Sequence, residues 1–231
     1  MTYPGLPRAT VDFLAALAVD NRRDWFEAHR DLYERDWLAA GLDLVAAVAA
    51  ALPGRAPGLL AVPKLNQSLR RLNRDVRFAA DKRPYEPALH LILSTGPAFN
   101  KVPGFHFVLR PEGLSYGGGW YGLGPTDLDR YRRRVSDPAD RARLVAALAQ
   151  AEKTGSTLDP PTLARVPAGF AADPDWDHLL RRKGVIARTQ APLAVPDWLF
   201  SSEAPARIAE LAAAHLPLLD WLTDRRTPAA G

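Results

Sequence analysis

The sequence of 231 residues predicts an α+β protein, in which an antiparallel or mixed central sheet packs against N-terminal and C-terminal helices. Three observations lead to this prediction. Apolar residues recur at three- and four-residue spacing over the first 52 positions, as they do on a buried helix face. Between positions 88 and 116 they alternate with other residues, as they do in strands. The helical spacing returns after position 202.

Two helices are expected in the N-terminal part. Thr10 is the expected N-cap of a short first helix. Asp24 is expected to cap a second, longer helix that continues to Leu52, with a kink at Gly41. The aromatic residues of the second helix are interpreted as core, because their spacing is usual for a buried face.

Strands are expected in the middle of the chain. Residues 59–65 are apolar and bounded by prolines, which predicts a strand. In residues 88–94 and 105–110, apolar residues alternate with other residues, which predicts two strands. A turn follows the second strand, so residues 114–116 would pair with it as an antiparallel strand. One face of this meander would be apolar and the other mixed. The mixed face would carry His90, His106 and Arg110.

Three consecutive glycines, Gly117 to Gly119, are expected to end the hairpin. Glycine adopts positive φ and permits close approach, so the run could offer amide donors to an oxyanion. A bulged strand end beneath a bulky neighbour is an equally good interpretation. The run is neither a phosphate-binding P-loop nor a dinucleotide fingerprint, because no Gly-Lys-Ser/Thr follows and no G-x-G-x-x-G opens a helix.

Two helices are expected after the glycine run. Thr126 or Asp127 would cap the first, at 128–135, and Asp137-Pro138 would begin the second, which runs to Lys153. The Pro- and Gly-rich stretch that follows, up to position 175, is interpreted as an ordered surface excursion.

The remaining elements are a short helix, a strand and a last helix. The short helix is expected at 175–182 and the strand at 184–189. Ser202 is expected to cap the last helix, which Pro217 should kink or split. Residues after Arg226 are expected to be frayed.

The composition limits the class of protein. The chain has no cysteine, which excludes disulfides, thiolate metal sites and cysteine nucleophiles. The N-terminal stretch lacks a secretory signal pattern, and no apolar run approaches the roughly 20 residues needed to cross a bilayer. We therefore expect a cytoplasmic protein without a membrane partner, folded as a single domain over residues 1–231.

The most charged stretch is residues 64–85, KLNQSLRRLNRDVRFAADKRPY. It contains seven cations and two carboxylates, a net charge of +5, whereas the whole protein carries +4. All the net positive charge can therefore be assigned to this segment. The pI of 9.6 would permit nucleic-acid contact, but the local cluster is the stronger indication of an anion site.

Turn-forming residues before the cluster and Pro84 after it predict a loop fixed at both ends, with Phe78 pointing inward. Such a loop would hold its guanidinium groups in a fixed direction. A guanidinium group can donate two parallel hydrogen bonds to a phosphate or a carboxylate. The main hypothesis is a pocket for a phosphorylated or nucleotide-like small molecule between this loop and the glycine run. The candidate ligand-binding residues are Lys64, Arg71, Arg74, Asp75, Arg77, Asp81, Lys82, Tyr85, Gly118, Gly119, Tyr121 and Arg130.

Two alternatives remain open. The cations of the loop could pair with Asp75, Asp81 and nearby helix carboxylates as a structural ion-pair network, so that removing Arg74 or Arg77 would destabilise the fold even without ligand. Alternatively, the same basic surface could contact nucleic acid. In that case residues 130–134 would add charge, and Trp120 and Tyr121 would stack on bases.

No reaction is indicated. Asp75, Asp81, His90, His106 and Tyr121 are the candidate acids and bases. The five histidines are isolated from one another in the sequence, so a metal site is not expected. No G-x-S-x-G pattern supports serine catalysis. Neither a catalytic residue nor a cofactor is assigned.

Four stretches carry a resemblance to a known family: FLAALAVDNRRDWFEAHRDLYE, NRDVRFAADKRPY, GGGWY and RVPAGFAADPDWDHLLRRKG. Together they resemble the bacterial and fungal family DUF2461. The resemblance extends from about Phe13 to about Lys183. It implies a single α+β domain, and it carries over no catalytic residue, cofactor or substrate.

Overall fold

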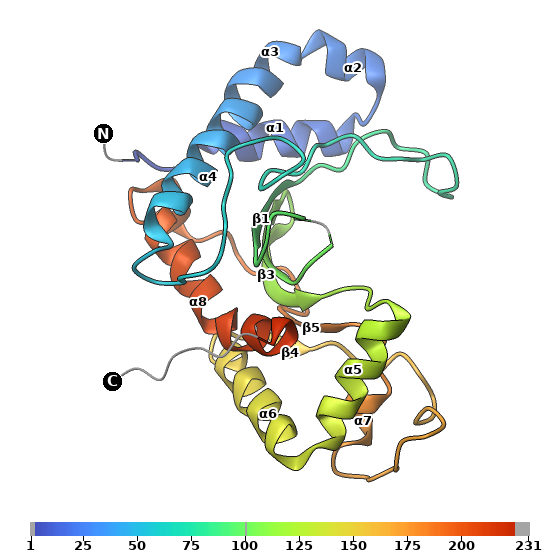
Figure 1. The fold of residues 1–231 in the computed structure, drawn as a ribbon. Helices are drawn as coiled ribbons and strands as arrows, with labels where there is room; N and C mark the ends of the chain where they lie inside the picture. The colour runs from blue at the N-terminus through green and yellow to red at the C-terminus, as the bar shows by residue number, and fades with distance from the viewer. Residues whose placement is uncertain (1–2, 100, 225–231) are drawn as a thin grey trace.

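The computed structural model describes residues 3–99 and 101–224. It confirms the α+β prediction, because five strands form one antiparallel sheet in the order β1-β2-β3-β5-β4, with helices around it (Figure 1). The strands are β1 Leu89–Ser94, β2 Gly104–Arg110, β3 Gly113–Trp120, β4 Thr157–Leu158 and β5 Val185–Arg188. The helices of the described residues are α1 Arg8–Val19, α2 Arg23–Ala28, α3 Arg30–Leu32, the π-helical η1 Tyr33–Ala39, α4 Ala40–Ala51, α5 Pro125–Ser136, α6 Pro138–Glu152, α7 Asp177–Leu180, the 3-10 helix η2 Asp197–Phe200 and α8 Ala204–Thr223.

The first helix begins earlier than predicted. It starts after Pro7, so Thr10 lies inside α1 and is not its N-cap. The Thr10 side chain is buried, and its hydroxyl donates to the carbonyl oxygen of Asp36 at 2.5 Å. The prediction was wrong because this hydroxyl has a partner in η1, 26 residues away along the chain.

The second predicted helix is a series of shorter pieces. It starts after Arg22, so Asp24 is not its N-cap. The α-helical geometry is interrupted at His29, which has ψ 27°, and again by the π-helical turns of η1. Gly41 does not interrupt it: α4 runs through this residue, where a Cβ would lie 2.9 Å from a methyl carbon of Leu89. The glycine there permits close packing of α4 on the sheet.

Residues 59–65 do not form a regular strand, contrary to the prediction. The stretch makes two isolated bridges, Leu60 with Ser94 and Leu65 with Leu69. The pairing that begins at Leu60 does not continue as a ladder, because the Val62 amide donates to the Ser68 hydroxyl at 2.9 Å and the Ile92 amide of β1 donates to the Ser68 carbonyl at 2.9 Å.

The glycine run lies inside β3 and does not end the hairpin as predicted. Gly117 is paired with His106 of β2 on one side and with Arg188 of β5 on the other. The run therefore occupies the middle of the sheet. Gly118 faces α8, where an added Cβ would lie 2.9 Å from the Cβ of His215. The missing side chains let a strand and a helix approach β3 closely.

The C-terminal half follows the predicted order with shifted boundaries. Gly124 precedes α5, so neither Thr126 nor Asp127 is its N-cap. The predicted start of α6 is confirmed, because the helix begins at Pro138, and the Asp137 carboxylate before it accepts a hydrogen bond from the Asp140 amide at 2.8 Å. The surface excursion contains the short strand β4, which was not predicted.

The last helix differs from the prediction at its N-cap, and it is continuous through Pro217. α8 begins at Ala204 after Glu203, so Ser202 is not its N-cap, and Pro217 does not split it. The predicted frayed residues after 226 lie outside the described residues. No helix in the described part is long and apolar enough to cross a membrane.

The two faces of the meander differ as predicted. Alternate residues of β1, β2 and β3, such as Leu91, Phe107 and Tyr116, join a core with α1, α4 and α8. The opposite side of the same strands is called here the open face. It carries the half-buried side chains of His90, His106, Arg110 and Ser115.

Candidate functional site

Residues 73–85 form a projecting segment, called here the basic arm (Figure 1). The two ends of the arm are joined by an antiparallel bridge between Asn73 and Tyr85 and by a hydrogen bond from the Arg74 amide to the Pro84 carbonyl at 2.9 Å. Asn21 fixes this base, because its side chain donates to the Tyr85 carbonyl at 3.0 Å and accepts from the Tyr85 amide at 3.1 Å. The buried Tyr85 ring also stacks on Phe26. The predicted fixed loop therefore exists, and Tyr85 anchors it.

Both carboxylates of the arm are paired within it. Asp81 binds Arg74 at 2.8 Å and Arg83 at 2.9 Å. Asp75 binds Arg77 at 2.7 Å. The hydrogen bonds from Arg83 and Arg77 lower the pKa of Asp81 and Asp75 respectively, so both remain ionised. These pairs favour the structural interpretation for the arm itself.

The tip of the arm contradicts one prediction. Phe78 was expected to point inward, but its side chain is 97% exposed. Lys82 folds back instead, and its ammonium donates to the carbonyl oxygens of Val76 at 3.0 Å and Arg77 at 3.3 Å. The tip is therefore held together by the hydrogen bonds of Lys82 and not by a buried Phe78 ring.

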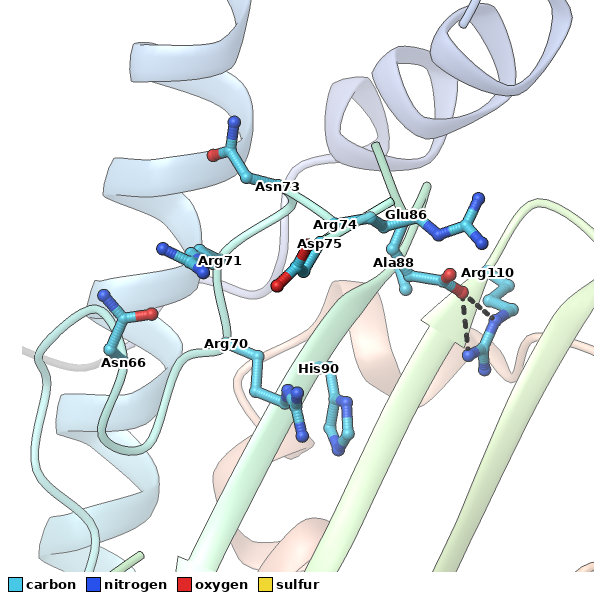
Figure 2. A pocket seen from close by; sticks show the side chains of 10 residues that line it. All are labelled: Asn66, Arg70, Arg71, Asn73, Arg74, Asp75, Glu86, Ala88, His90 and Arg110. Carbon is cyan, nitrogen blue, oxygen red and sulfur yellow. Dashed lines mark hydrogen bonds and ion pairs between the residues drawn. The ribbon is translucent and has the colours of Figure 1, made fainter. Parts of the chain in front are cut away.

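Three cations of the charged segment have no such partner. The side chains of Lys64, Arg70 and Arg71 make no hydrogen bond or ion pair within residues 3–99 and 101–224. Two of them, Arg70 and Arg71, face a cavity of about 590 Å³ between the arm and the open face (Figure 2). The cavity is lined by Asn66, Arg70, Arg71, Asn73, Arg74, Asp75, Glu86, Ala88, His90 and Arg110.

Figure 2 shows the Arg70 side chain beside the His90 ring, and Arg110 joined to Glu86. The Glu86 carboxylate accepts from two nitrogens of Arg110, at 3.0 and 3.2 Å. Arg110 is therefore partly neutralised, whereas Arg70 is not. The cavity carries an excess of positive charge at the end nearest His90.

Two further hollows adjoin this cavity on the open face. One, of about 230 Å³, has the glycine run as its floor and is also lined by His106, Tyr121 and Arg188. The other, of about 680 Å³, is lined by Arg70, Lys101, Tyr121 and Asp127 among others. His90 lines all three spaces, so they meet at this residue.

His90 and His106 form a hydrogen-bonded pair across β1 and β2. The distance from His90 Nε2 to His106 Nδ1 is 2.8 Å. Burial lowers the pKa of both rings, and the charge of Arg70 lowers it further, to about 4 for His106. Both rings are therefore neutral near pH 7, and one N–H is shared between them.

The structure brings together half of the predicted site residues. Arg71, Arg74 and Asp75 line the 590 Å³ cavity, and Gly118, Gly119 and Tyr121 line the glycine-floored hollow. The linings of the three spaces do not include Lys64, Arg77, Asp81, Lys82, Tyr85 or Arg130.

Two predicted contributions have other roles. Arg130, a candidate ligand-binding residue, pairs with Asp127 on α5 at 3.0 Å. The backbone of the run pairs with β2 and β5, which leaves few amides to cradle an anion as the hypothesis required.

The sequence-based hypothesis omitted residues that line the site. Arg70, Glu86 and Arg188 line the three spaces, and none of them is among the candidate residues of the sequence analysis. The alternating pattern did place His90, His106 and Arg110 on one face, which was the available signal. Residues 3–99 and 101–224 bring no three His, Asp or Glu side chains together in a way that could hold a metal ion.

Comparisons with known proteins identify the family alone. No curated protein and no solved structure matches the chain. A family model described as "Conserved hypothetical protein (DUF2461)" matches residues 9–221, which include the arm, the sheet and most of α8. The chain therefore belongs to the DUF2461 family.

Proposed function

We propose that the open face binds a small phosphorylated ligand, with the phosphate group near Arg70 and Arg71. The observation that carries the proposal is the Arg70 side chain, a cation without a carboxylate partner in the described residues that lines two adjoining cavities. An arginine that points into a cavity can offer several donors in a fixed plane, which suits a phosphate.

The size of the space is compatible with this ligand class. A cavity of about 590 Å³ falls within the usual range for small-molecule sites. The adjoining hollow over the glycine run lies beside the exposed ring of Tyr121. A nucleotide-like ligand could place its phosphate near Arg70 and its planar group against this ring.

The structural alternative accounts for only part of the charge. It explains Arg74, Arg77 and Arg83, each of which pairs with a carboxylate of the arm. It gives no role to Arg70, and it gives Arg71 only a charge near Asp75 that helps to lower the pKa of this carboxyl, without an ion pair. A ligand role for these two residues and a structural role for the arm are therefore compatible.

A decisive test is thermal-shift screening with nucleotides and sugar phosphates, followed by calorimetry on any compound that raises the melting temperature. We expect Arg70→Ala to weaken binding by roughly tenfold or more, because a charged hydrogen bond is lost. The matched control is Arg133→Ala, which removes the same charge from an exposed position on α5 outside the three spaces. The proposal fails if no compound produces a shift or if both variants bind equally well.

Nucleic acid is a second candidate partner, supported by the exposed Phe78 ring at the tip of a basic arm. Aromatic rings beside arginines are suited to stacking on unpaired bases. Titration of single-stranded DNA at two salt concentrations separates the two candidates. Binding that collapses with salt and is weakened by Phe78→Ala, but not by Arg70→Ala, would favour the arm as a nucleic-acid contact.

A further inference from the structure

The histidine pair has two ring nitrogens that remain free. His90 Nε2 and His106 Nδ1 bind each other, whereas His90 Nδ1 and His106 Nε2 make no hydrogen bond to any residue in the described ranges. The pair lies where the three spaces of the open face meet. Its outer nitrogens are therefore available to a ligand bound there.

The chemistry of the outer nitrogens follows from the neutral state of the pair. Each neutral imidazole has one N–H and one lone pair. If His90 donates the shared hydrogen bond, its outer nitrogen has a lone pair and that of His106 has a hydrogen. If His106 donates, the two are exchanged. In both cases the pair presents one donor and one acceptor.

Burial is the first reason that both rings stay neutral, because it lowers the pKa of each, and the charged and titratable groups around the pair add to it. They line the three spaces that meet at His90, and cations outnumber carboxylates: Arg70, Arg71, Arg74, Asp75, Glu86, Lys101, Arg110, Tyr121, Asp127 and Arg188, with Asp159 bound to Arg188. Positive charge nearby opposes protonation of a ring. The lone pair therefore persists near neutral pH.

We propose that the histidine pair makes this site select an oxyanion that carries a proton, such as hydrogen phosphate or the monoanion of a phosphomonoester, over sulfate. The inference rests on the proposed function and adds the chemical class of the ligand. The O–H of the ligand donates to the free lone pair, while the N–H of the pair donates to a second oxygen. Sulfate has no O–H to donate, so the lone pair of the imidazole nitrogen would face a sulfate oxygen without a hydrogen bond. A site built to pair with a ligand O–H discriminates strongly against an analogue that lacks it.

The primary test is calorimetric titration of the full chain with inorganic phosphate and with sulfate at pH 7.5, where both anions carry a charge close to −2. We expect phosphate to bind roughly tenfold or more tightly, which corresponds to leaving one acceptor unsatisfied. In the double variant His90→Phe/His106→Phe both anions should still bind through Arg70, with similar affinities. In Arg70→Ala both should weaken together.

A pH series on the unmodified protein provides a test that does not depend on a folded variant. The second pKa of a phosphomonoester is about 6, so its monoanion becomes populated as the pH falls. Methyl phosphate should therefore bind several-fold more tightly at pH 6 than at pH 8, whereas sulfate affinity should change little.

The outcomes distinguish this inference from the proposed function. Three results would each overturn the selectivity while leaving anion binding intact. The first is equal binding of phosphate and sulfate, and the second is a preference for phosphate that survives in the double variant. The third is an affinity for methyl phosphate that does not change with pH. If neither anion binds at all, the proposed function fails and the selectivity with it.

Discussion

At the scale of single residues, the glycine run shows how one pattern can have two causes. A run of small residues could expose amides to a ligand or allow close packing. Gly118 belongs to the second case, because it faces His215 of α8 and its strand pairs with β2 and β5. Gly119 has φ +155° and lies against the backbone of β5. The glycines therefore allow β5 and α8 to lie close to β3 beneath the open face.

Gly118→Ala should destabilise the protein by about 1–3 kcal/mol, because the added methyl overpacks the contact with His215. Urea denaturation followed by circular dichroism would measure the loss. The matched control is Gly54→Ala, at a position where an added Cβ meets nothing within 4 Å. A loss at position 54 as large as that at position 118 would contradict the packing argument.

The unpaired arginines are also a residue-scale feature. Composition showed that the charged segment has more cations than carboxylates, but not which cations remain free. Arg74 and Arg83 share Asp81, whereas Arg70 follows Leu69, which bridges to β1, and lines the cavity beside His90. The free charge is therefore near the sheet and not at the tip of the arm.

At the scale of elements, the arm is held by contacts between its two limbs. Arg74 is central to them, because its guanidinium reaches both the Asp81 carboxylate and the Arg83 carbonyl, at 2.8 and 3.1 Å. The pairs are partly exposed, with side-chain exposures of 25% for Arg74 and 39% for Asp81. Water and salt screen such pairs, so they should order the arm locally and contribute little to global stability.

Arg74→Ala should therefore increase the rate of chymotrypsin cleavage after Phe78 several-fold, because the limbs lose their cross-link while the core is unchanged. The urea midpoint should change little. Arg83→Ala serves as the control, since Arg83 pairs with a carboxylate only two residues away and does not span the limbs. A large drop in the urea midpoint of Arg74→Ala would show that the network supports the whole fold.

Across the whole molecule, the buried side chains of residues 3–99 and 101–224 form two hydrophobic clusters. The first joins the N-terminal helices to the sheet, and the second joins α5, α6, α7 and β5. α8 contributes to both, with Leu219 in the first cluster and Leu218 and Trp221 in the second. Because one helix is shared by both clusters, loss of either should expose part of the other.

The two clusters should unfold in a single transition. The six tryptophans divide evenly as reporters: Trp25, Trp37 and Trp198 pack in the first cluster, and Trp120, Trp176 and Trp221 in the second. With 5-fluorotryptophan incorporated, all six native fluorine resonances should disappear at the same urea concentration. Earlier loss of the three signals from the second cluster would indicate two independent folding units.

The fold class, the order of most elements and the shared face of His90, His106 and Arg110 could be predicted from the sequence. These follow from periodicity, which depends on residues close together in the chain. Several helix starts were predicted wrongly, as at Thr10 and Ser202. At Thr10 a contact far along the chain replaced the local one, whereas at Ser202 the helix begins one residue later than predicted, with Glu203 as its N-cap.

The tertiary structure alone decided which charges are paired and which face a cavity. The Coulomb energy and the cost of desolvation depend on distances in space, and these are set by elements far apart in the sequence. Arg70, Arg110 and Arg188 meet on the open face from three separate stretches of the chain. The sequence could therefore show that positive charge was in excess, but only the packing of the arm against the sheet could show where an anion would find it.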